Sequence, residues 1–192
     1  MPDTHAMPAW PSGEFESPLL ANQAHPAIVN LRGDPADLAW RAAVTDALGM
    51  GLPGPCSSVS TQTHRLVWAG PDDWFVISEQ MSGAALESQL RGALSGQMGA
   101  LTDVSSGYFQ VTLAGARARE LLSHGCPLDL SPRAFPVHHA AGTHFFKVGL
   151  YLWLTDDRPT FQMLVRRSFV DHFWQLVAAE SREFGVNRLI AG

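Results

Sequence analysis

Residues 65–78, RLVWAGPDDWFVIS, decide the fold of this 192-residue chain. Two apolar runs flank the turn Gly70-Pro71-Asp72-Asp73, and proline, glycine and aspartate are typical β-turn residues. Each run is rich in β-branched and aromatic side chains, which favour strands. The stretch therefore predicts a β-hairpin.

A strand and a helix are predicted before this hairpin, and a second helix after it. Residues 28–31 predict a short strand, and Asp34 is expected to cap a helix that begins at Pro35 and ends near Gly49. Ser82 is expected to cap the second helix. The apolar residues that share one face at helical spacing are Trp40, Val44, Ala47 and Leu48 in the first helix, and Leu86, Leu90 and Leu94 in the second.

The same order of elements recurs in the second half of the chain. We expect a strand at 108–113, a short helix after Gly115, a strand at 145–153, a return strand at 161–165, and a helix whose capping box is Ser168 and Asp171. The sequence therefore predicts an α+β fold of two β-α-β-β-α units, 26–100 and 101–192, with antiparallel or mixed sheets, packed as one pseudo-symmetric body. Chance recurrence of a common pattern is the alternative to duplication.

Residues 1–25 are predicted to form an irregular arm. Pro2, Pro8, Pro11 and Pro18 disfavour both a helix interior and a central strand. The arm still holds Trp10 and Phe15, and large apolar groups on an extended segment need a surface to cover them. That surface is expected to belong to a partner.

The composition excludes several classes of function. A net charge of −5 provides no cationic field for a nucleic acid. No stretch approaches the roughly 20 apolar residues of a membrane span, and the N-terminus lacks the features of a secretory signal. Cys56 and Cys126 lie far apart, so no disulfide framework is indicated, and a cytoplasmic protein is expected.

No set of residues indicates chemistry. His124, His138, His139, His144 and Cys126 are all zinc-ligand types, but their spacing matches no known zinc signature. Cys126 follows the electronegative end of a helix, which disfavours a thiolate. The aspartate pairs 72–73 and 156–157 fall in turns, and Gly115 lacks the further glycines of a phosphate loop. We predict no catalytic, cofactor-binding or metal-binding residue.

Arg166 and Arg167 directly precede a predicted helix. The pair could hold a carboxylate or the acidic patch of a partner, and a solvent-exposed pair is the alternative.

Several motifs resemble one family, the gamma subunits of heterotetrameric sarcosine oxidase. The resemblance extends over residues 28–185. Its most specific part is GCPLDL at 125–130 followed by PRAFP at 132–136; the other segments are LRGDP at 31–35, WAGPDDW at 68–74, DVS at 103–105 and TFQMLVRRSF at 160–169.

The resemblance implies a fold like that of the glycine-cleavage T-protein and other folate-binding domains. It implies a non-catalytic subunit in a complex with alpha, beta and delta subunits, with alpha as the main contact. That complex would demethylate sarcosine oxidatively to glycine, forming hydrogen peroxide and 5,10-methylenetetrahydrofolate. FAD, FMN, NAD, zinc and tetrahydrofolate would lie on the other subunits. The iron-sulfur-assembly folate proteins are excluded because Cys126 lies in Gly-Cys-Pro-Leu, which is not their cysteine motif.

The expected partner contacts are the arm 1–25, the loop 125–136 and the arginine pair. Their named residues are Trp10, Phe15, Cys126, Pro127, Leu128, Arg133, Phe135, Arg166 and Arg167. Two other functions stay open: a stand-alone folate-binding or aminomethyl-transfer protein, and a zinc protein that uses the stretch from His124 to His144.

Overall fold

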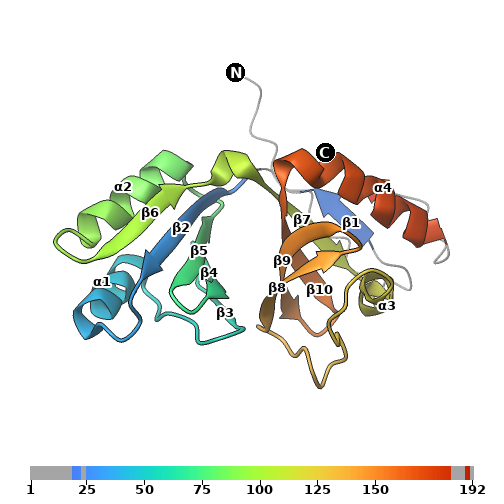
Figure 1. Ribbon diagram of the computed structural model, residues 1–192, viewed down its shortest axis with the longest axis horizontal. Helices are drawn as coiled ribbons and strands as arrows, with labels where there is room; N and C mark the ends of the chain where they lie inside the picture. The colour runs from blue at the N-terminus through green and yellow to red at the C-terminus, as the bar shows by residue number, and fades with distance from the viewer. Residues whose placement is uncertain (1–18, 23–24, 183–188, 191–192) are drawn as a thin grey trace.

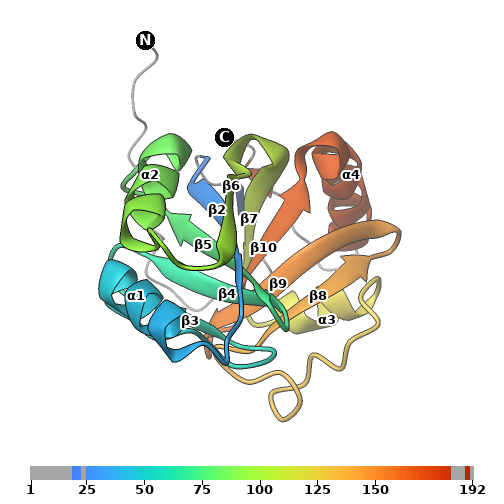
Figure 2. The ribbon, with the colours of Figure 1, turned by 60° about the vertical axis from the view of Figure 1, so that its left-hand side comes forward.

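The computed structural model describes residues 19–22, 25–182 and 189–190, and two β-sheets stand face to face in it. A pair of helices covers the outer face of each sheet, which gives four layers (Figure 1). The view from a second direction shows the same two sheets at the centre of the molecule (Figure 2). The class is α+β, as predicted.

The first sheet contains the hairpin. Its order is β3-β4-β5-β2-β6, and every neighbouring pair is antiparallel. The strands are β2 (Ala27–Gly33), β3 (Ser58–Ser60), β4 (Arg65–Gly70), β5 (Asp73–Ser78) and β6 (Gly99–Asp103). The helices α1 (Leu38–Leu48) and α2 (Gly83–Ala93) bury Trp40, Val44, Leu48, Leu86 and Leu90 in one apolar cluster against it.

The two helix starts show how local chemistry sets the boundaries. Asp37 caps α1, because its side chain accepts hydrogen bonds from the backbone of Ala39 and Trp40. Asp34 instead accepts from the backbone of Ala36 in the preceding turn, so the predicted cap was wrong. The prediction that Ser82 caps α2 is confirmed.

The second sheet has the order β11-β1-β7-β10-β9-β8. Only the pair β1–β11 is parallel. The strands are β1 (Leu19–Asn22), β7 (Tyr108–Ala114), β8 (Ala140–Phe145), β9 (Val148–Asp156), β10 (Thr160–Arg166) and β11 (Leu189–Ile190). Its helices are α3 (Ala118–Ser123) and α4 (Val170–Ser181), and the 3-10 turns η1 (Ser105–Gly107) and η2 (Arg167–Phe169) precede β7 and α4.

Three predictions are corrected in this half. The single strand predicted at 145–153 is the hairpin β8–β9, which turns at Phe146 with a φ of 50°. Ser168 does not cap α4, because the N-cap position is Phe169 and no side chain bonds there. The predicted irregular arm 1–25 contains strand β1, which pairs with β7, while Trp10 and Phe15 lie outside the described residues.

The predicted boundary at residue 100 also falls inside a strand. Strand β6 runs through it and pairs with β2, so the first sheet continues to Asp103. Strand β1, from the start of the chain, belongs to the second sheet. The two halves are therefore not contiguous blocks of sequence.

The inner faces of the sheets meet along one apolar strip. It consists of Ile28, Val67, Phe75 and Ile77 from the first sheet, and Tyr108, Ala140, Trp153 and Leu164 from the second. Along β10, Leu164 lies in the strip, whereas Gln162 lines a cavity at one end of it and Arg166 lines cavities at the other. The packed strip thus separates one cavity at one end from two adjoining cavities at the other.

Candidate functional site

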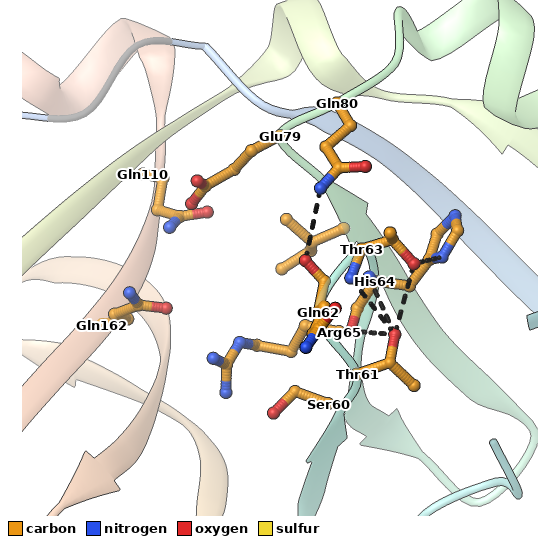
Figure 3. Close-up of a pocket in the computed structure, with 11 residues that line it drawn as sticks. Ser60, Thr61, Gln62, Thr63, His64, Arg65, Glu79, Gln80, Gln110 and Gln162 are labelled. Atoms are coloured by element: carbon orange, nitrogen blue, oxygen red, sulfur yellow. Dashed lines mark hydrogen bonds between the residues drawn. The ribbon is translucent and has the colours of Figure 1, made fainter. Parts of the chain in front are cut away.

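The first cavity, called the polar pocket below, has a volume of about 230 Å³ and lies where the hairpin loop before β4 faces β7 and β10 (Figure 3). Its lining residues are Ser60, Thr61, Gln62, Thr63, His64, Arg65, Ile77, Glu79, Gln80, Gln110 and Gln162. Amides and hydroxyls dominate this set, so the pocket offers hydrogen bonds rather than an apolar surface.

Arg65 and Glu79 are the charged groups of the polar pocket. The Arg65 guanidinium lies 6.0 Å from the centre of the Trp153 ring, a cation–π distance. Burial lowers the pKa of Arg65, and the charge of Glu79 opposes that shift. Trp153 Nε1 donates to Gln162 Oε1 at 3.2 Å, which fixes one of the amides.

The polar pocket does not assemble an acid–base pair. Burial lowers the pKa of His64, and its Nδ1 lies 2.8 Å from the Thr63 hydroxyl. Figure 3 shows the His64 ring on the side away from Gln110 and Gln162. This arrangement can hold a polar ligand by hydrogen bonds, and its hydroxyl–imidazole contact, Thr63 with His64, lies on the side of the pocket away from the two amides.

The second site, called the aromatic groove below, consists of two adjoining cavities of about 360 and 410 Å³ that share Tyr108, Tyr151 and Arg166. The Arg166 guanidinium lies 5.1 Å from the centre of the Tyr108 ring. Phe75 contacts both tyrosines edge-on, with ring centres 5.5 Å and 4.8 Å away. Burial raises the pKa of Tyr108, and the charge of Arg166 opposes the shift.

The predicted contact loop 125–136 turns two of its named side chains inward. Cys126 and Phe135 are 7% and 2% exposed and belong to the core under α3 and α4. Leu128 packs against the same core, while Pro127 and Arg133 are exposed. The prediction is corrected for Cys126 and Phe135, because the chain's own core uses these side chains.

Arg119 holds this loop in place. Its Nη1 donates to the carbonyls of Leu130 and of Phe135, the latter at 3.1 Å. The guanidinium also lies 5.4 Å from the centre of the Phe161 ring. This role could not be predicted from the sequence, because a single arginine on a short helix forms no motif.

Arg166 and Arg167 are both exposed, but they lie on opposite faces of the sheet. Arg167 Nε donates to the Ser106 carbonyl at 2.8 Å, and its guanidinium lies 5.3 Å from the Phe109 ring centre. Nη2 of Arg167 lies 3.2 Å from His25 Nδ1. The two arginines therefore do not form one site.

Within the described residues, no group of three or more histidine, cysteine, aspartate or glutamate side chains could hold a metal ion. His124 Nδ1 lies 2.8 Å from Glu180 Oε2, and His139 packs edge-on against Phe135. Both cysteines are free thiols. No helix in the described part of the chain is long and apolar enough to cross a membrane.

Except for Arg166, sequence reasoning missed the residues that line the polar pocket and the aromatic groove. A signal was present, because Gln110 and Gln162 each follow a phenylalanine inside an otherwise apolar strand. A polar residue on the inner face of such a strand indicates either a hydrogen-bonded core or a cavity. The strand pairing β10–β7 then brings the two amides onto neighbouring strands.

Residues 32–183 match the model of the family described as "Sarcosine oxidase, gamma subunit family". A sarcosine oxidase subunit gamma from Arthrobacter sp is 32% identical over 174 residues, which cover 89% of this chain and 84% of that protein. The corresponding subunit from Corynebacterium sp. (strain P-1) is 35% identical over 133 residues, which cover 68% of this chain and 64% of that protein.

Two solved structures are similar to the whole body. A chain of the heterotetrameric sarcosine oxidase from Corynebacterium sp. U-96 has a TM-score of 0.81 and 28% identity, with 93% of this chain and 90% of that chain covered. The glycine cleavage system aminomethyltransferase T from Bartonella henselae has a TM-score of 0.64 and 12% identity, with 86% of this chain and 46% of that chain covered. The latter likeness concerns the fold alone, which agrees with the predicted T-protein-like fold.

Proposed function

The chain belongs to the sarcosine oxidase gamma subunit family, and we propose that it is a non-catalytic subunit of a heterotetrameric sarcosine oxidase. The observation that carries the proposal is the match, over 90% of its length, to a chain of such a heterotetramer. The polar pocket agrees with this role, because the contact between its histidine, His64, and the Thr63 hydroxyl lies on the side away from Gln110 and Gln162.

In this proposal the complex oxidises sarcosine to glycine, with hydrogen peroxide and 5,10-methylenetetrahydrofolate as products. FAD, FMN, NAD, zinc and tetrahydrofolate are held by the alpha, beta and delta subunits, and alpha is the main contact of this chain. The assembly acts in the cytoplasm, where the free thiols Cys56 and Cys126 fit a reducing compartment.

The fold supports an origin by duplication. The strand order β2-β5-β4-β3 of the first sheet has the counterpart β7-β10-β9-β8 in the second. Strands β6 and β1 occupy equivalent places beside β2 and β7, and each sheet carries two helices on its outer face. A duplicated unit explains this correspondence better than chance does.

Coexpression tests the subunit role. The chain is produced together with the alpha, beta and delta subunits of a sarcosine oxidase from the same organism, and the complex is purified through a tag on alpha. We expect this chain to elute with the other three in equal amounts on size exclusion. A chain that elutes alone, while alpha, beta and delta assemble without it, contradicts the proposal.

A variant of the polar pocket tests the absence of catalysis. Glu79 is the carboxylate of the pocket, and a general base changed to its amide loses about 10²–10⁴-fold in rate. We expect Glu79→Gln to leave kcat of the assembled complex within twofold of the wild type. A loss of a hundredfold or more, with the complex intact, would assign chemistry to this chain.

A folate-binding or aminomethyl-transfer protein is the second candidate. The likeness to aminomethyltransferase T and the polar pocket between the sheets favour it. Calorimetry of the isolated chain with tetrahydrofolate separates the two. Binding that Gln162→Leu abolishes would support the second candidate, whereas no heat at millimolar ligand supports the subunit role.

A further inference from the structure

The first sheet leaves part of the inner face of the second sheet uncovered. Along β9, Gly149, Tyr151 and Trp153 alternate with the side chains of the outer core, so they share the inner face. Trp153 is fully buried in the apolar strip, Tyr151 is half-buried, and Gly149 is exposed. The first sheet therefore covers the inner face of β9 only as far as Tyr151. The uncovered part of that face, near Gly149, belongs to the aromatic groove.

The floor of the groove is open backbone at Gly149 on β9. Gly142 on β8 also lines the groove, but the Tyr151 ring covers it, since a Cβ there would lie 3.2 Å from Cε1 of that ring. A Cβ at Gly149 would meet no atom within 4 Å, and its φ is not positive. The pairing of β8 with β9 runs without a bulge through His144 and Gly149.

The chain's own fold therefore does not require glycine at position 149. Glycine inside a strand weakens it, because it packs no side chain and loses more backbone entropy. Without a bulge or a positive φ, the remaining physical reason for a strand glycine is the close approach of a ligand or of another backbone.

Arg166 brings a charge to the same groove. Its guanidinium is exposed, lies over Tyr108, and forms no ion pair with any described residue. Two carboxylates line the adjoining cavity: Asp73 accepts from Asn30 and lies 3.9 Å from Arg32, and Asp103 accepts from Ser105, so neither forms an ion pair with Arg166. An arginine that stacks on an aromatic ring with its donors unused can receive a carboxylate.

An exposed aromatic side chain also lines the groove. Phe169, in η2, is 49% exposed and lines the groove beside Arg166 and the two tyrosines. Aromatic residues and arginine are the types that dominate binding at protein interfaces. The groove is open to solvent along its length, whereas pockets for small molecules enclose most of the ligand surface.

From these observations we propose that the aromatic groove docks an extended segment of a partner subunit, which lays its backbone over Gly149 and places a carboxylate on Arg166. This inference rests on the proposed function, since it needs a partner subunit. The inference adds where the partner subunit binds and what the docked segment contains, which is an acidic side chain next to extended backbone.

Two variants test the docking in the coexpressed complex. Gly149→Leu adds a side chain whose Cβ would have no atom of this chain within 4 Å, and Arg166→Gln removes the charge but keeps hydrogen-bonding capacity. Gly92→Leu and Arg91→Gln, on the exposed surface of α2, are the matched controls, because Gly92 also has open space around it and Arg91 is also exposed. Circular dichroism and the urea midpoint of each isolated chain check that the fold is kept.

We expect Gly149→Leu to abolish copurification with the partner subunits, and Arg166→Gln to raise the dissociation constant by about tenfold or more. Both control variants should assemble like the wild type. Gly149→Leu that assembles with wild-type affinity would overturn the proposal. If the wild type itself does not assemble, the proposed function fails, which is a different outcome.

Two further measurements address other occupants of the groove. Benzoate serves as a planar carboxylate probe, titrated into the isolated chain and followed by NMR. Binding that Gly149→Leu removes, combined with normal assembly of this variant, would make the groove a small-molecule site and overturn the proposal. Sedimentation of the isolated chain is expected to show a monomer, and a dimer that Gly149→Leu dissociates would also overturn it.

Discussion

Replacing Arg119 with methionine should loosen the loop 125–136 without unfolding the protein. The change keeps most of the aliphatic volume over Phe161 and removes the hydrogen bonds to the carbonyls of Leu130 and Phe135. Hydrogen bonds to charged groups contribute about 1.5–3 kcal/mol each. Since Arg119 is only half-buried and water can replace part of this, we expect the loop to lose about 2 kcal/mol of local stability.

Limited proteolysis measures this loss directly. Arg133 is exposed within the loop, and trypsin needs local unfolding to cleave after it. When opening and closing are fast relative to cleavage, the cleavage rate follows the population of the open form, so 2 kcal/mol corresponds to about 30-fold faster cleavage. The fragment that ends at Arg133 is followed by mass spectrometry.

Arg91→Met is the matched control, because Arg91 forms an exposed ion pair with Glu87 on α2, and such pairs contribute little. Its rate of cleavage after Arg133 should equal that of the wild type. If Arg119→Met is cleaved within twofold of the wild-type rate, the two hydrogen bonds do not hold the loop and the reasoning is refuted.

Three other substitutions probe the body of the protein. Leu164→Ala removes a fully buried side chain from the strip between the sheets and should lower the unfolding free energy by about 2–5 kcal/mol, with one cooperative urea transition for both sheets. Gly33→Ala places a Cβ 2.2 Å from Cε2 of Trp40 and should cost about 1–3 kcal/mol in the same urea assay, so an unchanged midpoint would contradict the close packing. Burial lowers the pKa of His139 below the usual value of about 6.5, so the unfolded chain binds this proton more readily and stability should fall as the pH drops below about 6.5. His139→Gln should therefore flatten the dependence of the urea midpoint on pH between about pH 7.5 and 5.5, and an unchanged dependence would contradict this reasoning.

The elements that were predicted correctly are those in which apolar residues at regular spacing mark one buried face. The hairpin formed by β4 and β5 and the two helices packed on the first sheet have one clearly buried face each, and Gly49 ends α1 with a φ of 67° as expected. Strands β3 and β6 were missed, because edge strands bond on one side only and most of their side chains are exposed.

The turn between β8 and β9 was missed for a different reason. It is made by Phe146, which adopts a positive φ although phenylalanine is not a turn residue. Ser168 has the right spacing for a capping box, but η2 occupies the positions where the cap would form. In both cases tertiary packing overrides the local signal.

The candidate sites were harder to predict, because they depend on which parts of two sheets fail to touch. The arginine pair at 166 and 167 was singled out from the sequence, yet only the strand geometry separates the two onto opposite faces. Likewise, the apolar residues of loop 125–136 indicated a contact surface, and the structure uses Cys126 and Phe135 for the core. An apolar irregular loop does not by itself tell an internal contact from an external one.

The strip between the sheets also explains how one fold can support different functions. The likeness to aminomethyltransferase T, which covers 46% of that protein, concerns the backbone, and two sheets that pack only along their middle leave cavities at both ends of the contact. What such a cavity does depends on a few strand-end residues, because function lies in sites placed on folds. In this chain one end holds the neutral amides Gln110 and Gln162. The other end holds Arg166, which lies over Tyr108 and forms no ion pair among the described residues, together with the open backbone of Gly149. If Glu79→Gln leaves the rate unchanged and Gly149→Leu releases the partner subunits, the fold serves here through its second cavity, as a docking surface.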